Sequence, residues 1–176
     1  IDYPELMHDL LALITNTYIQ YRKYIQPDIN DAVYDGKKCY VHFGMYNGSV
    51  VIKDDTATAT ISQDMYKEFA MPYNAKIFKS FGTGSIHYCG VQKPLHYECM
   101  VSQDISCINF GNSELYNWKD SFSTLAQNKI CFVNVGEGQP YSYVRELMDN
   151  ILTGVTFMTQ ADSRLDAVEI LKRHKG

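Results

Sequence analysis

The sequence predicts an α/β protein, and three observations support this class. Five short apolar runs are rich in β-branched and aromatic residues, turn residues bound them, and segments with helical periodicity lie between them. Strands that alternate with helices in this way form βαβ units around a parallel sheet. Of the 176 residues, 45% are hydrophobic and 20% are charged, as in ordinary globular domains. Residues 1–176 contain no repeat, low-complexity tract or linker, so we expect a single domain.

The chain opens with a predicted amphipathic helix. Pro4 lies in the first turn, where its missing N–H costs nothing. Apolar residues then recur at helical spacing to about Ile25. Pro27 and the polar residues that follow are expected to end this helix.

The next predicted elements are extended. The pattern from Cys39 to Gly48 is ambiguous between a strand and a hairpin arm, with a turn sequence at Tyr46-Asn47-Gly48. Val50-Val51-Ile52 is a short buried strand that ends in the carboxylates of Asp54 and Asp55.

Helices and strands alternate through the rest of the chain. Ser62 is expected to cap a helix that Pro72 kinks and that Gly82 and Gly84 terminate. The remaining predicted strands are Ser85–Cys89, Ser106–Phe110, Ile130–Val135 and Val155–Met158, and the remaining helices are Leu95–Val101, Ser113–Ala126, Tyr141–Leu152 and one through Leu165, Val168 and Leu171.

Polar residues gather at the carboxyl ends of the predicted strands. They are Asp54, Asp55, His87, Cys89, Asn109, Asn134, Thr159 and Asp162. A (β/α)8 barrel builds its active site at these ends, but a complete barrel takes about 250 residues and at least about 200. The chain therefore forms either an open sheet or, as we predict, about the C-terminal five βα units of a barrel. No glycine-rich phosphate-binding motif follows any strand, which removes the usual support for a nucleotide fold.

Charge and cysteine content narrow the partners and the compartment. The formal net charge is −4 without a basic stripe, so nucleic acid is not expected as a partner. No apolar run approaches the ~18 residues of a membrane span. The five cysteines include no Cys-x-x-Cys pair, which favours a reducing cytoplasm. The start at Ile1, with neither Met nor a signal segment, predicts a cut end and a missing upstream segment. Open sheet edges would then pair with that segment or with another subunit.

The sharpest local motif is Ser85-Ile86-His87-Tyr88-Cys89-Gly90. Side chains alternate along a strand, so His87 and Cys89 are expected on the same face. An imidazole and a thiolate are good zinc ligands, but two ligands alone do not make a site. Taken by itself, this spacing also fits a buried core cysteine beside a chance histidine.

Several stretches resemble the uroporphyrinogen decarboxylase superfamily. They are Asp54-Asp55-Thr56-Ala57, Ile61 to Phe69 with Pro72-Tyr73, Gly84 to Gly90, and Ile108 to Glu114. The His-x-Cys-Gly element is most similar to the corrinoid-dependent methyltransferase branch. The resemblance implies a (β/α)8 barrel, with this chain as its C-terminal portion. It also implies zinc held by His87, Cys89 and a second cysteine after the last strand. Thr159-Gln160-Ala161-Asp162 stands there instead, so Asp162 or Cys107 would be the third ligand, or the site would lack metal.

The resemblance implies methyl transfer from a corrinoid protein to a thiol that zinc activates. A metal-free tetrapyrrole decarboxylase and a non-catalytic corrinoid- or small-ligand-binding member are the alternatives. The decarboxylase would need arginines at the substrate carboxylates, and none of the four arginines lies at a predicted strand end. Asp54, Asp55 and Asn109 are the candidate catalytic residues, although each could instead cap a turn or bond loop backbone.

Overall fold

The computed structural model describes residues 2–32, 38–41, 44–47, 50–54, 60–89, 105–112, 115, 128–136, 138–148 and 154–174. Asp55, the predicted helix at 95–101 and most of the predicted helix at 113–126 lie outside these residues. Within them, no helix combines the length and the apolar character needed to cross a membrane.

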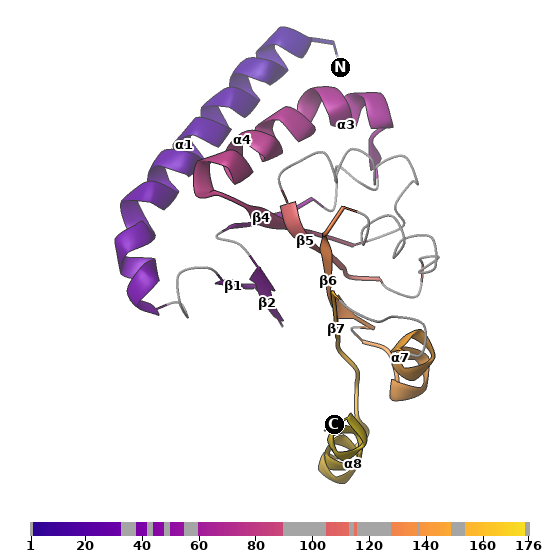
Figure 1. Cartoon of the computed structure of the whole chain (residues 1–176). Helices are drawn as coiled ribbons and strands as arrows, with labels where there is room; N and C mark the ends of the chain where they lie inside the picture. Colours follow the sequence, from indigo (N-terminus) through magenta and orange to yellow (C-terminus); the bar gives the residue numbers. More distant parts are fainter. Residues whose placement is uncertain are drawn as a thin grey trace.

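A five-stranded parallel sheet forms the centre of the fold (Figure 1). Its strands are β3 (Val50–Lys53), β4 (Gly84–Tyr88), β5 (Ile105–Phe110), β6 (Cys131–Val135) and β7 (Val155–Phe157), and they lie side by side in chain order. Neighbours such as Ile86 and Ile108 pair in parallel register. The predicted α/β class and the five parallel strands are therefore confirmed.

The helices are α1 (Pro4–Ala32), α3 (Gln63–Phe69), α4 (Met71–Phe81), α7 (Tyr141–Met148) and α8 (Arg164–His174). One apolar core joins α4 and α7 to the sheet. Phe78 of α4 and Leu147 of α7 pack into the same cluster as Ile86, Ile108 and Phe132 from three adjacent strands. The helices α4 and α7 thus cover the same face of the sheet.

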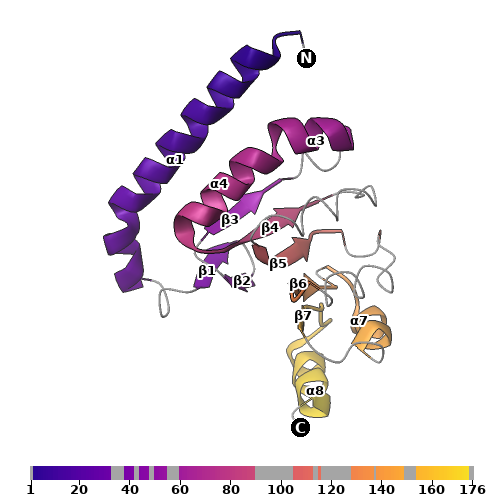
Figure 2. The ribbon, with the colours of Figure 1, turned by 45° about the horizontal axis from the view of Figure 1, so that its top comes forward.

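A short antiparallel hairpin precedes the sheet. It consists of β1 (Lys38–Val41) and β2 (Gly44–Asn47), so the ambiguous stretch from Cys39 forms a hairpin. Tyr46 and Asn47, which were expected in a turn, lie within β2 and pair with Cys39 and Lys38. The hairpin contacts strands β3 to β6 and lies on the side of the sheet away from α4 (Figures 1 and 2).

Pro27 and Pro72 were both expected to interrupt a helix, and only Pro72 does so. The expectation that Pro27 ends the first helix is wrong, because α1 runs on to Ala32. A proline costs one intrahelical hydrogen bond there, and the helix still continues for more than one turn. Pro72 behaves as expected, since the helix is interrupted at Ala70 and Pro72 lies in the first turn of α4. Ser62 caps α3 by accepting a hydrogen bond from the Met65 amide at 3.2 Å.

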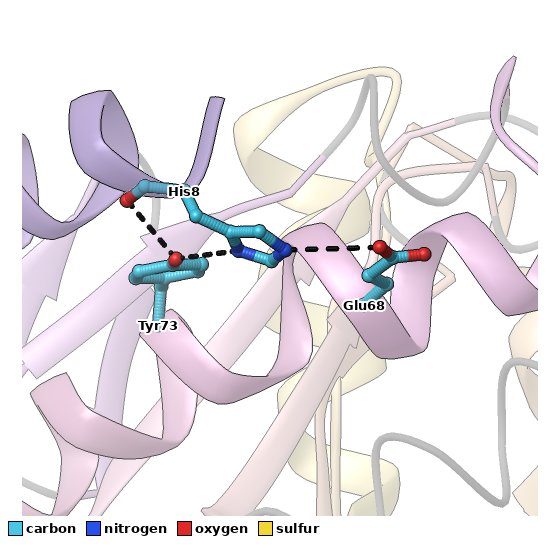
Figure 3. Close-up of polar contacts among 3 residues, drawn as sticks. All are labelled: His8, Glu68 and Tyr73. Atoms are coloured by element: carbon cyan, nitrogen blue, oxygen red, sulfur yellow. Dashed lines mark hydrogen bonds and ion pairs between the residues drawn. The ribbon is translucent and has the colours of Figure 1, made fainter. Parts of the chain in front are cut away.

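His8 attaches α1 to the helices beside it (Figure 3). Its Nδ1 bonds to the Tyr73 hydroxyl at 2.8 Å, and that hydroxyl donates to the His8 carbonyl at 3.1 Å. Its Nε2 lies 3.7 Å from a Glu68 carboxylate oxygen, and its ring stacks on Phe69 with 4.8 Å between centroids. His8 thus joins α1 to both α3 and α4.

Replacing Tyr73 with phenylalanine should weaken this attachment. The variant loses two partly buried hydrogen bonds, so the free energy of unfolding should fall by about 1–2 kcal/mol in a urea titration. In a His8→Ala background the cost should be smaller, because only the bond to the backbone carbonyl remains to be lost. Equal costs in the two backgrounds would contradict the side-chain bond.

Candidate thiolate and metal site

The sheet face opposite α4 and α7 carries polar side chains in two rows. Ile52, Ile86, Ile108 and Phe132 are neighbours in register and face the helices, so the alternate residues of the same strands point the other way. The first row is Val51, Ser85, Cys107 and Cys131, and the second, nearer the carboxyl ends, is Lys53, His87, Asn109 and Val133. The predicted site residues His87 and Asn109 are therefore neighbours on adjacent strands.

Asn109 orients the imidazole of His87. The Asn109 amide nitrogen donates to the Val133 carbonyl at 2.6 Å, which turns Oδ1 toward the ring. His87 Nδ1 lies 2.5 Å from that oxygen. Because an amide oxygen only accepts, Nδ1 carries the proton, and Nε2 of the neutral ring carries a lone pair. Asn109 is fully buried and His87 is 9% exposed, so the protein interior holds this pair in place.

Cys89 follows β4 immediately and faces the same imidazole. Its Sγ lies 3.5 Å from His87 Nε2, as the alternation of side chains predicted. A tetrahedral zinc at its usual distances from nitrogen and sulfur would hold those two atoms about 3.6 Å apart. The separation therefore fits two ligands of one zinc ion. It also fits a thiol beside its general base.

Gly111 makes room for the thiol. A Cβ at this position would stand 2.5 Å from Cys89 Sγ, whereas its distances to the His87 ring and to Cys89 Cβ would be 3.5 and 3.6 Å. Among the described residues, only the Cys89 sulfur lies too close to permit a side chain at position 111. Gly111 was not predicted as a site residue. It could have been, because it is a glycine that directly follows β5, the strand beside the one that carries His87.

Gly111→Ala should strain the site through the sulfur atom. The added methyl overpacks the contact, so the free energy of unfolding should fall by about 1–3 kcal/mol in the native background. In a Cys89→Ala background the sulfur is gone and the cost should approach zero. Urea titrations of the four proteins complete the cycle, and additive costs would refute the proposed contact.

The thiol of Cys107 has a different partner. It lies one row below Asn109 and contacts the Ser85 hydroxyl at 2.8 Å, with both residues fully buried. Cys131 is its register neighbour on β6. Cys107, considered above as a third zinc ligand, is thus engaged with Ser85.

Asp54 lies at the end of β3 and connects the sheet to the helices. Its Oδ2 accepts hydrogen bonds from the Tyr66 hydroxyl and from the Asn74 amide, both at 2.9 Å. Its backbone amide donates to the His87 carbonyl at 2.8 Å, which prolongs the pairing of β3 with β4. Asp54 therefore fixes the backbone beside His87 while its carboxylate engages α3 and α4.

Asp162 lies beyond β7, and two strands separate β7 from β4 in the sheet. Its backbone amide donates to the Asp166 carboxylate at 3.1 Å, at the start of α8. Among the described residues, no three His, Cys, Asp or Glu side chains form a group that could hold a metal. The structure thus brings together His87, Cys89 and Asn109 and does not group Asp162 with them.

None of the family models, curated proteins or solved structures compared with this chain gives a significant match. The geometry of His87, Cys89 and Asn109 and the residue patterns of the sequence are therefore the evidence that bears on function.

Proposed function

We propose that this chain forms the catalytic part of a methyltransferase that moves a methyl group from a corrinoid protein to a thiol, with His87 and Cys89 as zinc ligands. One observation carries the proposal: Nε2 of His87 faces Cys89 Sγ at 3.5 Å, while Asn109 holds the opposite ring nitrogen. Zinc-bound histidines ordinarily have their second nitrogen bonded to such an outer partner, which fixes the tautomer.

We also infer that the sheet is part of a (β/α)8 barrel. Two features support this architecture over a doubly wound sheet. The strands follow one another in chain order without reversal, and α4 and α7 pack on one face only. The opposite face, which would line a barrel, carries His87 and Asn109 toward the carboxyl ends of the strands.

Zinc-dependent methyl transfer would give each of the three residues a separate role. His87 offers a neutral nitrogen, Cys89 offers sulfur, and Asn109 keeps the ring turned toward that sulfur. Bound zinc would lower the pKa of a substrate thiol at its open position. His87 Nε2 and Cys89 Sγ would hold the zinc, the corrinoid would supply the methyl group, and the sulfur of the substrate thiol would receive it. The thiol proton leaves to solvent.

A second candidate function needs no metal. The described residues supply only two of the three protein ligands that a catalytic zinc site uses. The contacts among these residues also match those of cysteine-dependent hydrolases. Cys89 would be the nucleophile, His87 the base beside it, and Asn109 the amide that orients the base. In that function Cys89 itself would attack an electrophilic carbon and give its proton to His87 Nε2.

The decarboxylase alternative receives less support. Its chemistry needs arginines at the substrate carboxylates. Arg22 lies on α1 with its guanidinium 6.0 Å from the Phe81 ring centroid, and the other three belong to α7 and α8. None of the four therefore lies on a strand of the sheet.

The distinguishing experiment supplies free methylcobalamin and a panel of small thiols to zinc-loaded and chelator-treated protein. Methyl transfer predicts loss of the alkylcobalamin absorption and a methyl thioether detected by mass spectrometry, only with zinc. The metal-free function predicts no transfer and instead alkylation of Cys89 by iodoacetamide that His87→Ala slows. Transfer that survives both chelation and Cys89→Ala would contradict the zinc-thiolate proposal.

A further inference from the structure

Helix α1 has two apolar faces, and the fold covers only one of them. Thr15 and Ile19 are buried on the inner face, where α1 runs alongside α4 and α3 (Figures 1 and 2). On the opposite face lie seven exposed large apolar side chains: Tyr3, Leu6, Leu10, Leu13, Ile14, Tyr21 and Tyr24. A helix at a protein surface ordinarily has a polar outer face. This outward face, named here the α1 outer face, therefore requires a partner.

The spacing of the α1 outer face specifies a helix as that partner. Tyr3, Leu6, Leu10 and Leu13 follow one another at intervals of three, four and three residues. Thr17 and Tyr24 continue the repeat, with Gln20 at the seam position between them. Alternating steps of three and four residues form the seam of a two-helix coiled coil. Ile14 and Tyr21 widen the seam on one side.

The size of the α1 outer face is sufficient for a stable contact. Tyr3 is 73% exposed, Leu13 64% and Tyr24 82%. With typical side-chain areas, the seven residues expose on the order of 800 Å². A standard protein interface buries about 800 Å² on each partner.

The charges beside the seam favour a second copy of α1 in antiparallel orientation. Asp9 and Lys23 lie on the same flank, near opposite ends of the seam. In an antiparallel pair the flank of one helix meets the same flank of the other, so each Asp9 faces the Lys23 of the other copy. In a parallel pair this flank would instead meet the opposite flank, which carries Ile14 and Tyr21, so the pairing of Asp9 with Lys23 would be lost. The charges do not favour a membrane as the partner. Interfacial membrane helices carry many basic residues on their polar face, whereas the N-terminal end of α1 is acidic, with Asp2, Glu5 and Asp9.

We propose that the α1 outer face binds the same face of a second copy of this chain, giving a symmetric homodimer with antiparallel α1 helices. The register that joins Asp9 to Lys23 also pairs Tyr24 with Leu6 and Thr17 with Leu13 of the other copy. It places Ile14 next to Ile14 on the two-fold axis. An interface of this kind uses one patch on both subunits, as a two-fold symmetric dimer requires.

Sedimentation equilibrium of the whole chain tests the dimer. The native protein should sediment as a dimer at micromolar concentration. Leu10→Glu with Leu13→Glu should raise the dimer dissociation constant by about a hundredfold or more, since charges then lie in the centre of the seam. Leu171→Glu is the matched control, because Leu171 is 61% exposed on α8 and should leave the dimer intact.

Cysteine cross-linking tests the orientation. Under mild oxidation Ile14→Cys should form a covalent dimer, whereas Tyr21→Cys should stay monomeric on a denaturing gel, as should the native protein with its own cysteines. A parallel pair would place Leu10 beside Leu10 of the other copy, so a covalent dimer of Leu10→Cys without one of Ile14→Cys would overturn the proposed register. A native chain that remains monomeric at all concentrations would overturn the proposal, and binding of that monomer to lipid vesicles would assign the face to a membrane instead.

Discussion

Replacing Cys89 with alanine is expected to abolish zinc binding at this site and, with it, zinc-dependent methyl transfer. The described residues bring two zinc donors together, and the variant leaves His87 alone. A single imidazole does not hold zinc against solvent, because even catalytic sites use three protein ligands. Elemental analysis of protein purified without chelator should fall from about one zinc per chain to near zero. The thiol is exposed, so its loss should change the free energy of unfolding by less than about 0.5 kcal/mol.

Cys131→Ala provides the control for the loss of a thiol. Cys131 lies on the same face of the sheet, in the row below His87, and packs against Val133 and Cys107. Its variant should keep its zinc. Equal zinc contents in the Cys89→Ala variant and the native protein would rule out Cys89 as a ligand.

Asn109→Leu should have the second-largest effect, on both stability and metal affinity. Leucine cannot make the two hydrogen bonds of the Asn109 amide. It neither accepts from His87 Nδ1–H nor donates to the Val133 carbonyl. Each such loss costs about 1–3 kcal/mol, so the free energy of unfolding should fall by about 2–6 kcal/mol. Zinc affinity should also fall about 10- to 100-fold, because the tautomer is no longer fixed.

Asn109→Asp separates the two roles of Asn109. The aspartate can still accept from His87 Nδ1, so the ring orientation and most of the zinc affinity should return. It cannot donate to the Val133 carbonyl, so part of the stability loss should remain. Urea titration and competition for zinc with a chromogenic chelator measure the two quantities. If Asn109→Asp restored stability but not affinity, the orienting role of Asn109 would be wrong.

The strands were predictable because each is a short apolar run between turn residues. Val50 to Lys53 and Cys131 to Val135 show this, and the limits of each strand agree with prediction to within about one residue. The end of α1 was predicted at Ile25, whereas the helix continues through Pro27. The rule that a proline ends a helix overestimates the free-energy cost of one missing hydrogen bond near the end of a helix.

The candidate site was predictable only in part, for a physical reason. That His87 and Cys89 share a face follows from alternation within one strand. That Asn109 bonds His87 depends on the register between β4 and β5, which no local pattern specifies. Asp54 was expected to have a catalytic role or to cap a turn, and its carboxylate bonds Tyr66 and Asn74 of α3 and α4. The position of Asp162 likewise depends on how the strands are ordered.

Cobalt substitution tests the central claim most directly, namely that His87 and Cys89 ligate one metal ion. Co²⁺ added to the metal-free native chain should give the near-ultraviolet absorption of a thiolate-to-cobalt charge transfer. Cys89→Ala should lose this band, His87→Ala should weaken cobalt binding, and Cys131→Ala should leave the spectrum unchanged. A native spectrum without the thiolate band, or a band that persists in Cys89→Ala, would contradict the proposed metal site.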